Sequence, residues 1–383
     1  MVTSRTLPSP KLLRNLSFSA LAGLLAVGAI ALVQDNLALE RQESAIESET
    51  TAFIRRSSLQ SDNGSAIALK KKAAALGIAI EYPSSASSVQ VNASEKRIFS
   101  QLEKPLDRYI TAQGKTGFDK TQRSRFDALP PELTSYLNAR EQKLTLLRNT
   151  LRFHKTPEWE RNGNWLESGD PGTMPDFGGL LRLQNLLLAD AIAQYDRGNQ
   201  ARTFENLDAA WVLSESLKNR PELKAQRTYF KLIRTHLGML RRLDNLPPQW
   251  QQRLSQRNYR STFNRALESE ALLQYNATQR FRPTKAEKLA PILTPEELQA
   301  LKGGGMPARN QIRHIGIDRY QAIRRLHDSL PHADLYAIVF PQESEKETLL
   351  QRDFAIMSPS IQEALRELTR VELETKSTLI MDN

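Results

Sequence analysis

The chain has 383 residues, a formal net charge of +10 and no cysteine. The absence of cysteine excludes disulfide bridges, thiolate catalysis and cysteine-ligated zinc. Hydrophobic residues make up 40% of the chain and charged residues 25%, which is the composition of a globular protein with a sizeable core.

The N-terminus begins with a basic leader, residues 1–14, which holds Arg5, Lys11 and Arg14 and no acid. An uncharged, mostly apolar run follows over residues 15–34. About 20 helical residues span about 30 Å, the thickness of a bilayer's hydrocarbon core. Because basic flanks stay in the cytoplasm, the pattern predicts a single-pass transmembrane signal anchor with a cytoplasmic N-terminus and an extracytoplasmic (periplasmic or equivalent) body.

A cleaved signal peptide is the alternative interpretation of the same segment, with Ala29-Ile30-Ala31 as the cleavage site. The apolar run continues past that site to Val33, which favours the anchor. Both interpretations export the body, so nucleic acid is not an expected partner. Anionic lipid headgroups or wall polymers, or plain solvation, would then account for the net charge of +7 that remains without the leader.

A stalk helix is predicted over residues 35–58, where Leu39, Ile46 and Phe53 recur every seven residues. This spacing predicts either a homodimer through the stalk or packing on the chain's own body. Residues 59–93 are predicted to be a linker region. Within it, Gly77–Tyr82 fits one short β element that Pro83 closes.

The body, residues 94–383, shows helical periodicity of apolar residues in at least five segments. We therefore predict a mostly all-α fold, an irregular antiparallel helical bundle that follows the transmembrane helix. The predicted helices are 94–112, 129–151, 180–197, 204–217, 221–240, 250–279, 310–329 and one that begins at Ser358-Pro359; 111–125 and 156–179 are predicted loops, and 335–340 a strand or buried loop.

The layout contains Ala75-Leu76-Gly77-Ile78-Ala79-Ile80, then Leu129-Pro130-Pro131-Glu132-Leu133, then a leucine-rich hairpin that runs from Leu181 through Gly198 to Leu213. Over roughly Leu76 to Leu254 it resembles exported or single-pass, all-helical bacterial proteins with no assigned activity. The resemblance implies a helical fold and no particular chemistry.

Motifs that would indicate catalysis or a cofactor are incomplete. Gly114-Lys115-Thr116 matches the end of a phosphate-binding loop, but Tyr109 stands where that motif needs another glycine. The five histidines, none of them paired at i, i+4, are His154, His236, His314, His327 and His332. We predict no catalytic residue, no cofactor and no metal site.

Two sets of residues are candidate contact sites. Basic residues at helical spacing form the first, which we expect to dock an anionic surface: Lys224, Arg227, Lys231, Arg234 and Arg241. The alternative is the solvated side of an amphipathic helix. The second set is an acidic loop with Trp159, Trp165 and Phe177, which either contacts a partner or pins the loop onto the bundle.

The sequence as a whole predicts a membrane-anchored, extracytoplasmic helical scaffold or interaction protein that binds another envelope protein or an anionic surface. An extracytoplasmic enzyme of unidentified reaction class is the alternative, and it requires an apolar cleft with converging acids of perturbed pKa. A sensing subunit is a third interpretation, which requires a partner for signal output.

Overall fold

The computed structural model describes residues 37–58, 61–80, 89–119, 126–161, 163–168, 177–243, 246–279, 299, 306–340 and 348–380. The chain divides into two compact units, residues 1–55 and 56–383. The leader and the predicted span, residues 1–34, lie outside the described residues. Among the helices that are described, none combines the length and the apolarity needed to cross a bilayer.

The first unit contains most of a helix over residues 37–57, where the stalk helix was predicted. The three side chains of the seven-residue stripe are all buried: Leu39, Ile46 and Phe53 are 8%, 5% and 2% exposed. The stalk-mediated homodimer stays a prediction.

The second unit is built from helices, and its described residues contain no strand. The all-α class is therefore confirmed. The helices are α2 (Gly64–Ala75), α3 (Ala93–Thr116), α4 (Pro131–Ala139), α5 (Glu141–Phe153), α6 (Asn164–Ser168), α7 (Gly178–Asp196), α8 (Gln200–Glu215), α9 (Leu223–Leu240), α10 (Pro248–Ser255), α11 (Tyr259–Gln279), α13 (Met306–Ser329), α14 (Leu335–Val339), α15 (Leu349–Ile356) and α16 (Pro359–Ile380).

Several local predictions need correction. Residues 78–80 form no strand, although Ile78 and Ile80 are buried. The region predicted as a linker contains α2, whose alanine- and leucine-rich side joins the core. The run 335–340 is the short helix α14, capped by the side chain of Asp334. A short apolar run is compatible with a strand, a helix or a buried loop. Here the N-terminal cap favours the helix.

Two predicted helices are each divided in two. The 129–151 helix breaks at Arg140 between α4 and α5. The 250–279 helix breaks after Ser255, and the side chain of Asn258 accepts a hydrogen bond of 3.0 Å from the backbone N–H of Ser261 at the start of α11. Neither break carries glycine or proline, so apolar spacing alone does not reveal it.

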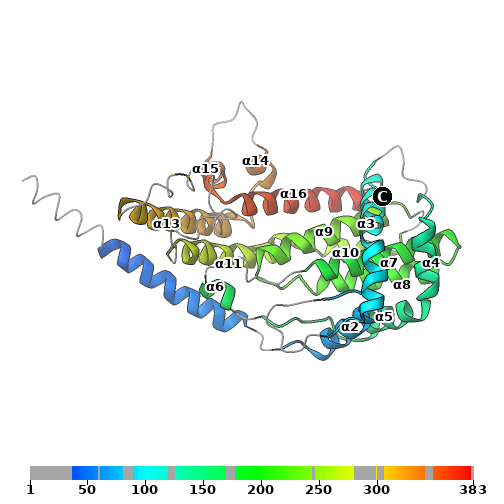
Figure 1. Cartoon of the computed structure of the whole chain (residues 1–383). Coiled ribbons are helices and arrows are strands. Elements are labelled where there is room, and N and C mark those ends of the chain that lie inside the picture. Colours follow the sequence, from blue (N-terminus) through cyan, green and yellow to red (C-terminus); the bar gives the residue numbers. More distant parts are fainter. Residues whose placement is uncertain are drawn as a thin grey trace, which may run out of the picture. The chain divides into compact units, whose positions relative to one another are not determined.

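The core of the second unit is centred on α7, α8 and α9, which follow one another through short connections. Gly198, with φ of +74°, ends the α7 segment as predicted, because only glycine adopts that conformation without strain. Helix α16 packs along α9, and α13 packs along α11 (Figure 1). The C-terminal helix thus lies against a helix that begins more than 130 residues earlier in the chain.

Helix α3 crosses α9 at glycines on both helices. A Cβ atom added to Gly238 of α9 would lie 2.2 Å from the carbonyl oxygen of Gly114 in α3, and one added to Gly117 would lie 1.9 Å from the carbonyl oxygen of Gly238. The two backbones therefore touch, as only glycine permits. This crossing extends α3 to Thr116, beyond the predicted end at Ala112, and places Lys115 beside α9.

Candidate anion-binding groove

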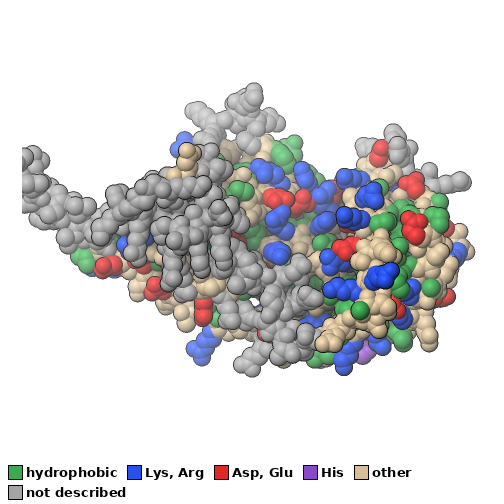
Figure 2. Space-filling view, in the orientation of Figure 1, with side chains coloured by type: hydrophobic (Ala, Val, Ile, Leu, Met, Phe, Trp, Pro, Cys, Tyr) green, Lys and Arg blue, Asp and Glu red, His purple; other side chains and the backbone are tan. Residues whose placement is uncertain are grey.

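A groove of about 390 Å³ lies where α3, α9 and α16 meet. Lys and Arg side chains gather over these three helices on the face shown in Figure 2, with a few Asp and Glu side chains among them. The lining residues are Thr111, Gly114, Lys115 and Phe118 from α3 and its end, Lys224, Arg227, Thr228, Lys231, Arg234 and Thr235 from α9, and Glu363 and Glu367 from α16. We call it the lysine groove.

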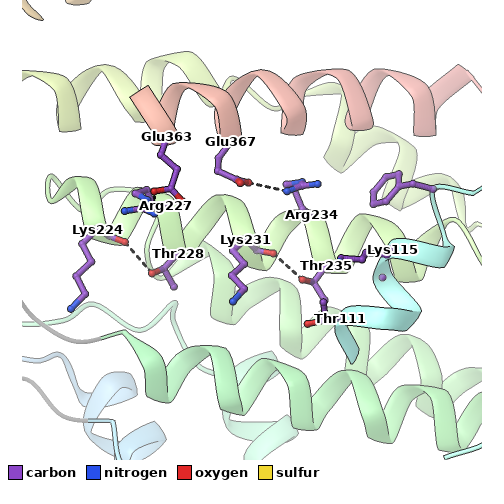
Figure 3. A pocket seen from close by; sticks show the side chains of 12 residues that line it. Thr111, Lys115, Lys224, Arg227, Thr228, Lys231, Arg234, Thr235, Glu363 and Glu367 are labelled. Atoms are coloured by element: carbon purple, nitrogen blue, oxygen red, sulfur yellow. Dashed lines mark hydrogen bonds and ion pairs between the residues drawn. The ribbon is translucent and has the colours of Figure 1, made fainter. Parts of the chain in front are cut away.

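The basic stripe predicted on α9 separates into two rows. Arg227, Arg234 and Arg241 follow each other at intervals of seven residues and form the arginine row. Lys224 and Lys231 are also seven residues apart and form the lysine row. Figure 3 shows Arg227 and Arg234 directed toward α16, and the two lysines on the other side of α9.

Two members of the arginine row, Arg227 and Arg234, are paired with carboxylates of α16. Arg227 lies 2.5 Å from a carboxylate oxygen of Glu363. Arg234 donates through Nε and an Nη atom to both oxygens of Glu374, at 2.8 Å each, and through its other Nη to Glu367 at 2.9 Å. Although burial lowers the pKa of Arg234, its hydrogen bonds and charge contacts with these glutamates outweigh that effect and raise the pKa.

Arg241 completes the arginine row at the C-terminal end of α9. It is 8% exposed and donates to the backbone carbonyl of Gly117 at 2.9 Å and to the hydroxyl of Ser377 at 3.0 Å. Its guanidinium also lies 5.0 Å from the ring centre of Phe118. The side chain thus joins α3, α9 and α16, and it is a structural group rather than part of an exposed stripe.

The lysine row remains exposed, and α3 adds a third ammonium to it. Lys115, Lys224 and Lys231 are all exposed and all line the groove. Within the described part of the chain, the side-chain ammonium groups of Lys115 and Lys231 form no ion pair or hydrogen bond. The ammonium groups of Lys115 and Lys231 are available to a ligand.

Threonines fill the spaces between the lysines. The hydroxyls of Thr228 and Thr235 each donate a 3.0 Å hydrogen bond to the carbonyl four residues earlier, at Lys224 and Lys231. Their hydroxyl protons are therefore used within α9, whereas the ammonium groups of Lys115 and Lys231 are free donors. Five cations and two carboxylates line the groove, an excess of three positive charges. An excess of positive charge favours the approach of an anionic group.

The second predicted contact site lies inside the molecule. Trp159, Trp165 and Phe177 are 1%, 4% and 1% exposed. The indole of Trp159 donates to the hydroxyl of Ser216 at 3.1 Å, and the guanidinium of Arg220 lies 5.6 Å from the ring centre of Phe177. The alternative interpretation, in which these rings fix the long loop to the bundle, accounts for their burial.

Two kinds of sequence motif remain, the Gly114-Lys115-Thr116 segment and the histidines. Gly114-Lys115-Thr116 is the C-terminal end of α3, whereas a phosphate-binding loop precedes a helix. Among the residues that the structure describes, no group of three or more His, Asp or Glu is placed to hold a metal ion.

Two buried titratable groups were not singled out from the sequence. Burial raises the pKa of Glu270 in α11 to about 7, against a weaker opposing hydrogen bond from Gln274, and burial lowers the pKa of His236 in α9 to about 3. The His236 ring packs 5.0 Å from the ring of Trp250 and 5.6 Å from that of Trp211. Neither group lines the lysine groove.

Sequence reasoning also missed Lys115, Glu363 and Glu367 as groove residues, because they come from helices far from α9 in the chain. One available signal was the spacing of Glu367 and Glu374, which repeats the seven-residue spacing of the arginine row. A search for complementary charge spacings on pairs of predicted helices would have found it.

Comparison of the sequence with protein-family models gave no match, and comparisons with curated proteins and with solved structures gave none either.

Proposed function

We propose that the protein is a membrane-anchored, extracytoplasmic helical scaffold that binds an acidic segment of another envelope protein in the lysine groove. The proposal rests on a contrast within the groove: Arg227 and Arg234 of α9 are paired with α16, while the ammonium groups of Lys115 in α3 and Lys231 in α9 are exposed without partners among the described residues. Because those ammonium groups line one groove and pair with no described residue, an acidic ligand in the groove would supply the partner that they lack.

A concave site suits a protein segment better than a flat lipid surface. The groove has carboxylates along its α16 edge, and the side chain of Glu363 is 54% exposed. A continuous anionic surface would meet this carboxylate as well as the lysines. A discrete acidic segment can approach the lysines and avoid Glu363.

The groove is tested with the full chain in neutral detergent micelles and poly-L-glutamate as the probe. We expect Lys115→Gln/Lys224→Gln/Lys231→Gln to weaken binding about tenfold or more, which corresponds to about 1.4 kcal/mol. High salt should weaken the wild type in the same way, because exposed charges are screened beyond about 8 Å at 0.15 M ionic strength. Lys71→Gln/Lys96→Gln, which changes exposed lysines of α2 and α3 outside the groove, is the matched control.

Equal affinity of the triple variant and the wild type would contradict the proposal. Lysine-dependent binding to phosphatidylglycerol vesicles without binding to polyglutamate would instead identify the partner as a lipid surface, against the protein partner proposed here.

The anchor is tested separately, by carbonate washing of membranes and by protease treatment of intact spheroplasts. We expect the chain to stay in the membrane fraction, with its body accessible to protease from outside. A mature chain that begins at Leu32 in the soluble fraction would show that the segment is a cleaved signal peptide.

A further inference from the structure

A second concave site in the same unit shares no lining residue with the lysine groove. It is a pocket of about 480 Å³ between the loop that precedes α6, the connection from α8 to α9, and α11. We call it the arginine pocket, and its charged lining residues are Arg161, Lys218, Arg220, Arg265, Glu158 and Glu215. Glu215 already pairs with Arg257, which is not part of the lining.

Arg220 builds the inner wall of the arginine pocket. Its side chain is 3% exposed, and its Nε donates a hydrogen bond of 2.9 Å to the carboxylate of Glu222. One Nη atom donates to the backbone carbonyls of Trp159, at 3.1 Å, and Glu160, at 2.8 Å. The guanidinium of Arg220 therefore fixes the loop to the connection between α8 and α9, and with it the position of Arg161.

Arg161 and Arg265 meet at one backbone carbonyl. Each donates through Nη1 to the oxygen of Asn219 at 3.3 Å, so their Nη1 atoms are no further apart than twice that distance. Among the described residues, neither arginine forms an ion pair, and neither does Lys218. Since a guanidinium has five N–H donors, most donors of Arg161 and Arg265 remain for a ligand.

The positive charges of the arginine pocket lie close enough to affect one another. Burial lowers the pKa of Arg161, and the charges of Arg220 and Arg265 lower it further. The carboxylates of Glu222 and Glu158 oppose this effect without cancelling it. An anion between Arg161 and Arg265 would offset the repulsion between them.

We propose that the arginine pocket binds a phosphate group between the guanidinium groups of Arg161 and Arg265, with Lys218 as a third cation. A phosphate dianion offsets both guanidinium charges, whereas a carboxylate offsets one. Its oxygens also accept hydrogen bonds from two planar forks at once. The volume lies in the range of small-molecule sites, roughly 300–1,000 Å³, so the ligand is free phosphate or a small phosphorylated molecule.

Inorganic phosphate is the first probe, titrated into the full chain in neutral detergent and followed by calorimetry. We expect the wild type to bind it saturably below about 10 mM. Arg161→Gln/Arg265→Gln should weaken binding about tenfold or more, because both forks are lost. Arg97→Gln/Arg108→Gln, which changes two exposed arginines of α3 outside the pocket, is the matched control and should bind like the wild type.

Two further variants separate loss of the site from other effects. Lys115→Gln/Lys224→Gln/Lys231→Gln should keep the wild-type affinity for phosphate, because the lysine groove is a different site. Arg265→Gln alone changes an exposed side chain, which protects the test against unfolding of the double variant. We expect this single variant to weaken binding about threefold or more and to keep the wild-type melting temperature.

Glycerol 3-phosphate and acetate distinguish the possible ligands. Tighter binding of glycerol 3-phosphate than of inorganic phosphate would identify a phosphorylated small molecule, and the reverse order would identify free phosphate. Either order supports the arginine pocket as a phosphate site. Equal affinity for acetate and phosphate, equal affinity of the wild type and the arginine variants, or no saturable binding by the wild type would overturn it.

Discussion

The arginine row and the lysine row of α9 have the same spacing along the chain but different surroundings in the structure. Each has basic residues at seven-residue intervals, and the arginine row is displaced from the lysine row by three positions, Lys224 to Arg227 and Lys231 to Arg234. On a helix, residues three apart are neighbours on the surface. Yet one row is paired with α16 and the other is exposed. The difference comes from the helix that packs on α9, and it teaches that charge spacing alone does not identify a binding face.

The residue types fit the two environments. The planar guanidinium of Arg234 donates to two carboxylates at once, in a bidentate arrangement with Glu374. An ammonium group on a flexible stem cannot reproduce that geometry. Lysine on the exposed row keeps a mobile, well-hydrated charge that can adjust to a ligand.

The largest effect is expected at the crossing that supports both rows. Gly238→Ala places a methyl group 2.2 Å from the carbonyl oxygen of Gly114, so α3 must move, together with Lys115 and the Gly117 carbonyl that Arg241 binds. We expect a loss of about 3 kcal/mol in the free energy of unfolding, measured with urea. Gly64→Ala, which has no neighbouring atom within 4 Å, is the control and should unfold like the wild type. Equal stability of the two variants would contradict the close crossing.

The buried side of α9 should make stability depend on pH. His236 has its pKa lowered from 6.5 to about 3 by burial. Below pH 6.5 the unfolded chain therefore binds a proton that the folded chain does not, and stability is lost as pH falls from 6.5 toward 3. Between pH 7.5 and 5 the wild type should lose about 2 kcal/mol more than His236→Leu. Parallel pH profiles of the two proteins would show that this side of α9 is open to water.

Loss of an arginine should lower the free energy of unfolding, whereas loss of a lysine from the neighbouring row should not. Arg234→Met leaves Glu367 and Glu374 without their shared partner, and because Arg234 is 30% exposed we expect a cost of about 1 to 2 kcal/mol after allowance for solvent screening. Lys231→Met on the neighbouring row should leave the unfolding free energy unchanged within error. A similar loss in both variants would mean that the lysine row is also paired.

The sequence predicted the all-α fold and the helix boundaries that glycine or proline marks, such as Gly198 and Pro359. It did not predict the breaks at Arg140 and near Asn258, where a change of direction or a side-chain cap interrupts regular apolar spacing. Burial of Trp159 was equally hidden, because an aromatic residue in a polar loop can cover the core or face a partner. Such distinctions depend on long-range packing.

The candidate site was predicted in part. All five basic residues of α9 were recognised, and two of them line the groove as exposed lysines. Their division into two rows could be recognised only once the packing of α16 on α9 was known. The contribution of Lys115 could be recognised only once the glycine crossing of α3 and α9 was known. Periodicity on one helix shows which residues share a face, but it contains no information about the helix that covers that face.

The smallest effects are expected from a reciprocal exchange that keeps every charge. Arg234→Lys retains the positive charge beside Glu367 and Glu374 but removes the bidentate fork, so we expect a loss of about 1 kcal/mol by urea unfolding. Lys231→Arg retains an exposed charge that pairs with no described residue, so stability should not change, and polyglutamate should bind with the wild-type affinity. If Lys231→Arg stabilises the protein as much as Arg234→Lys destabilises it, a carboxylate of the chain can reach the lysine row, and the two rows differ in residue type but not in role.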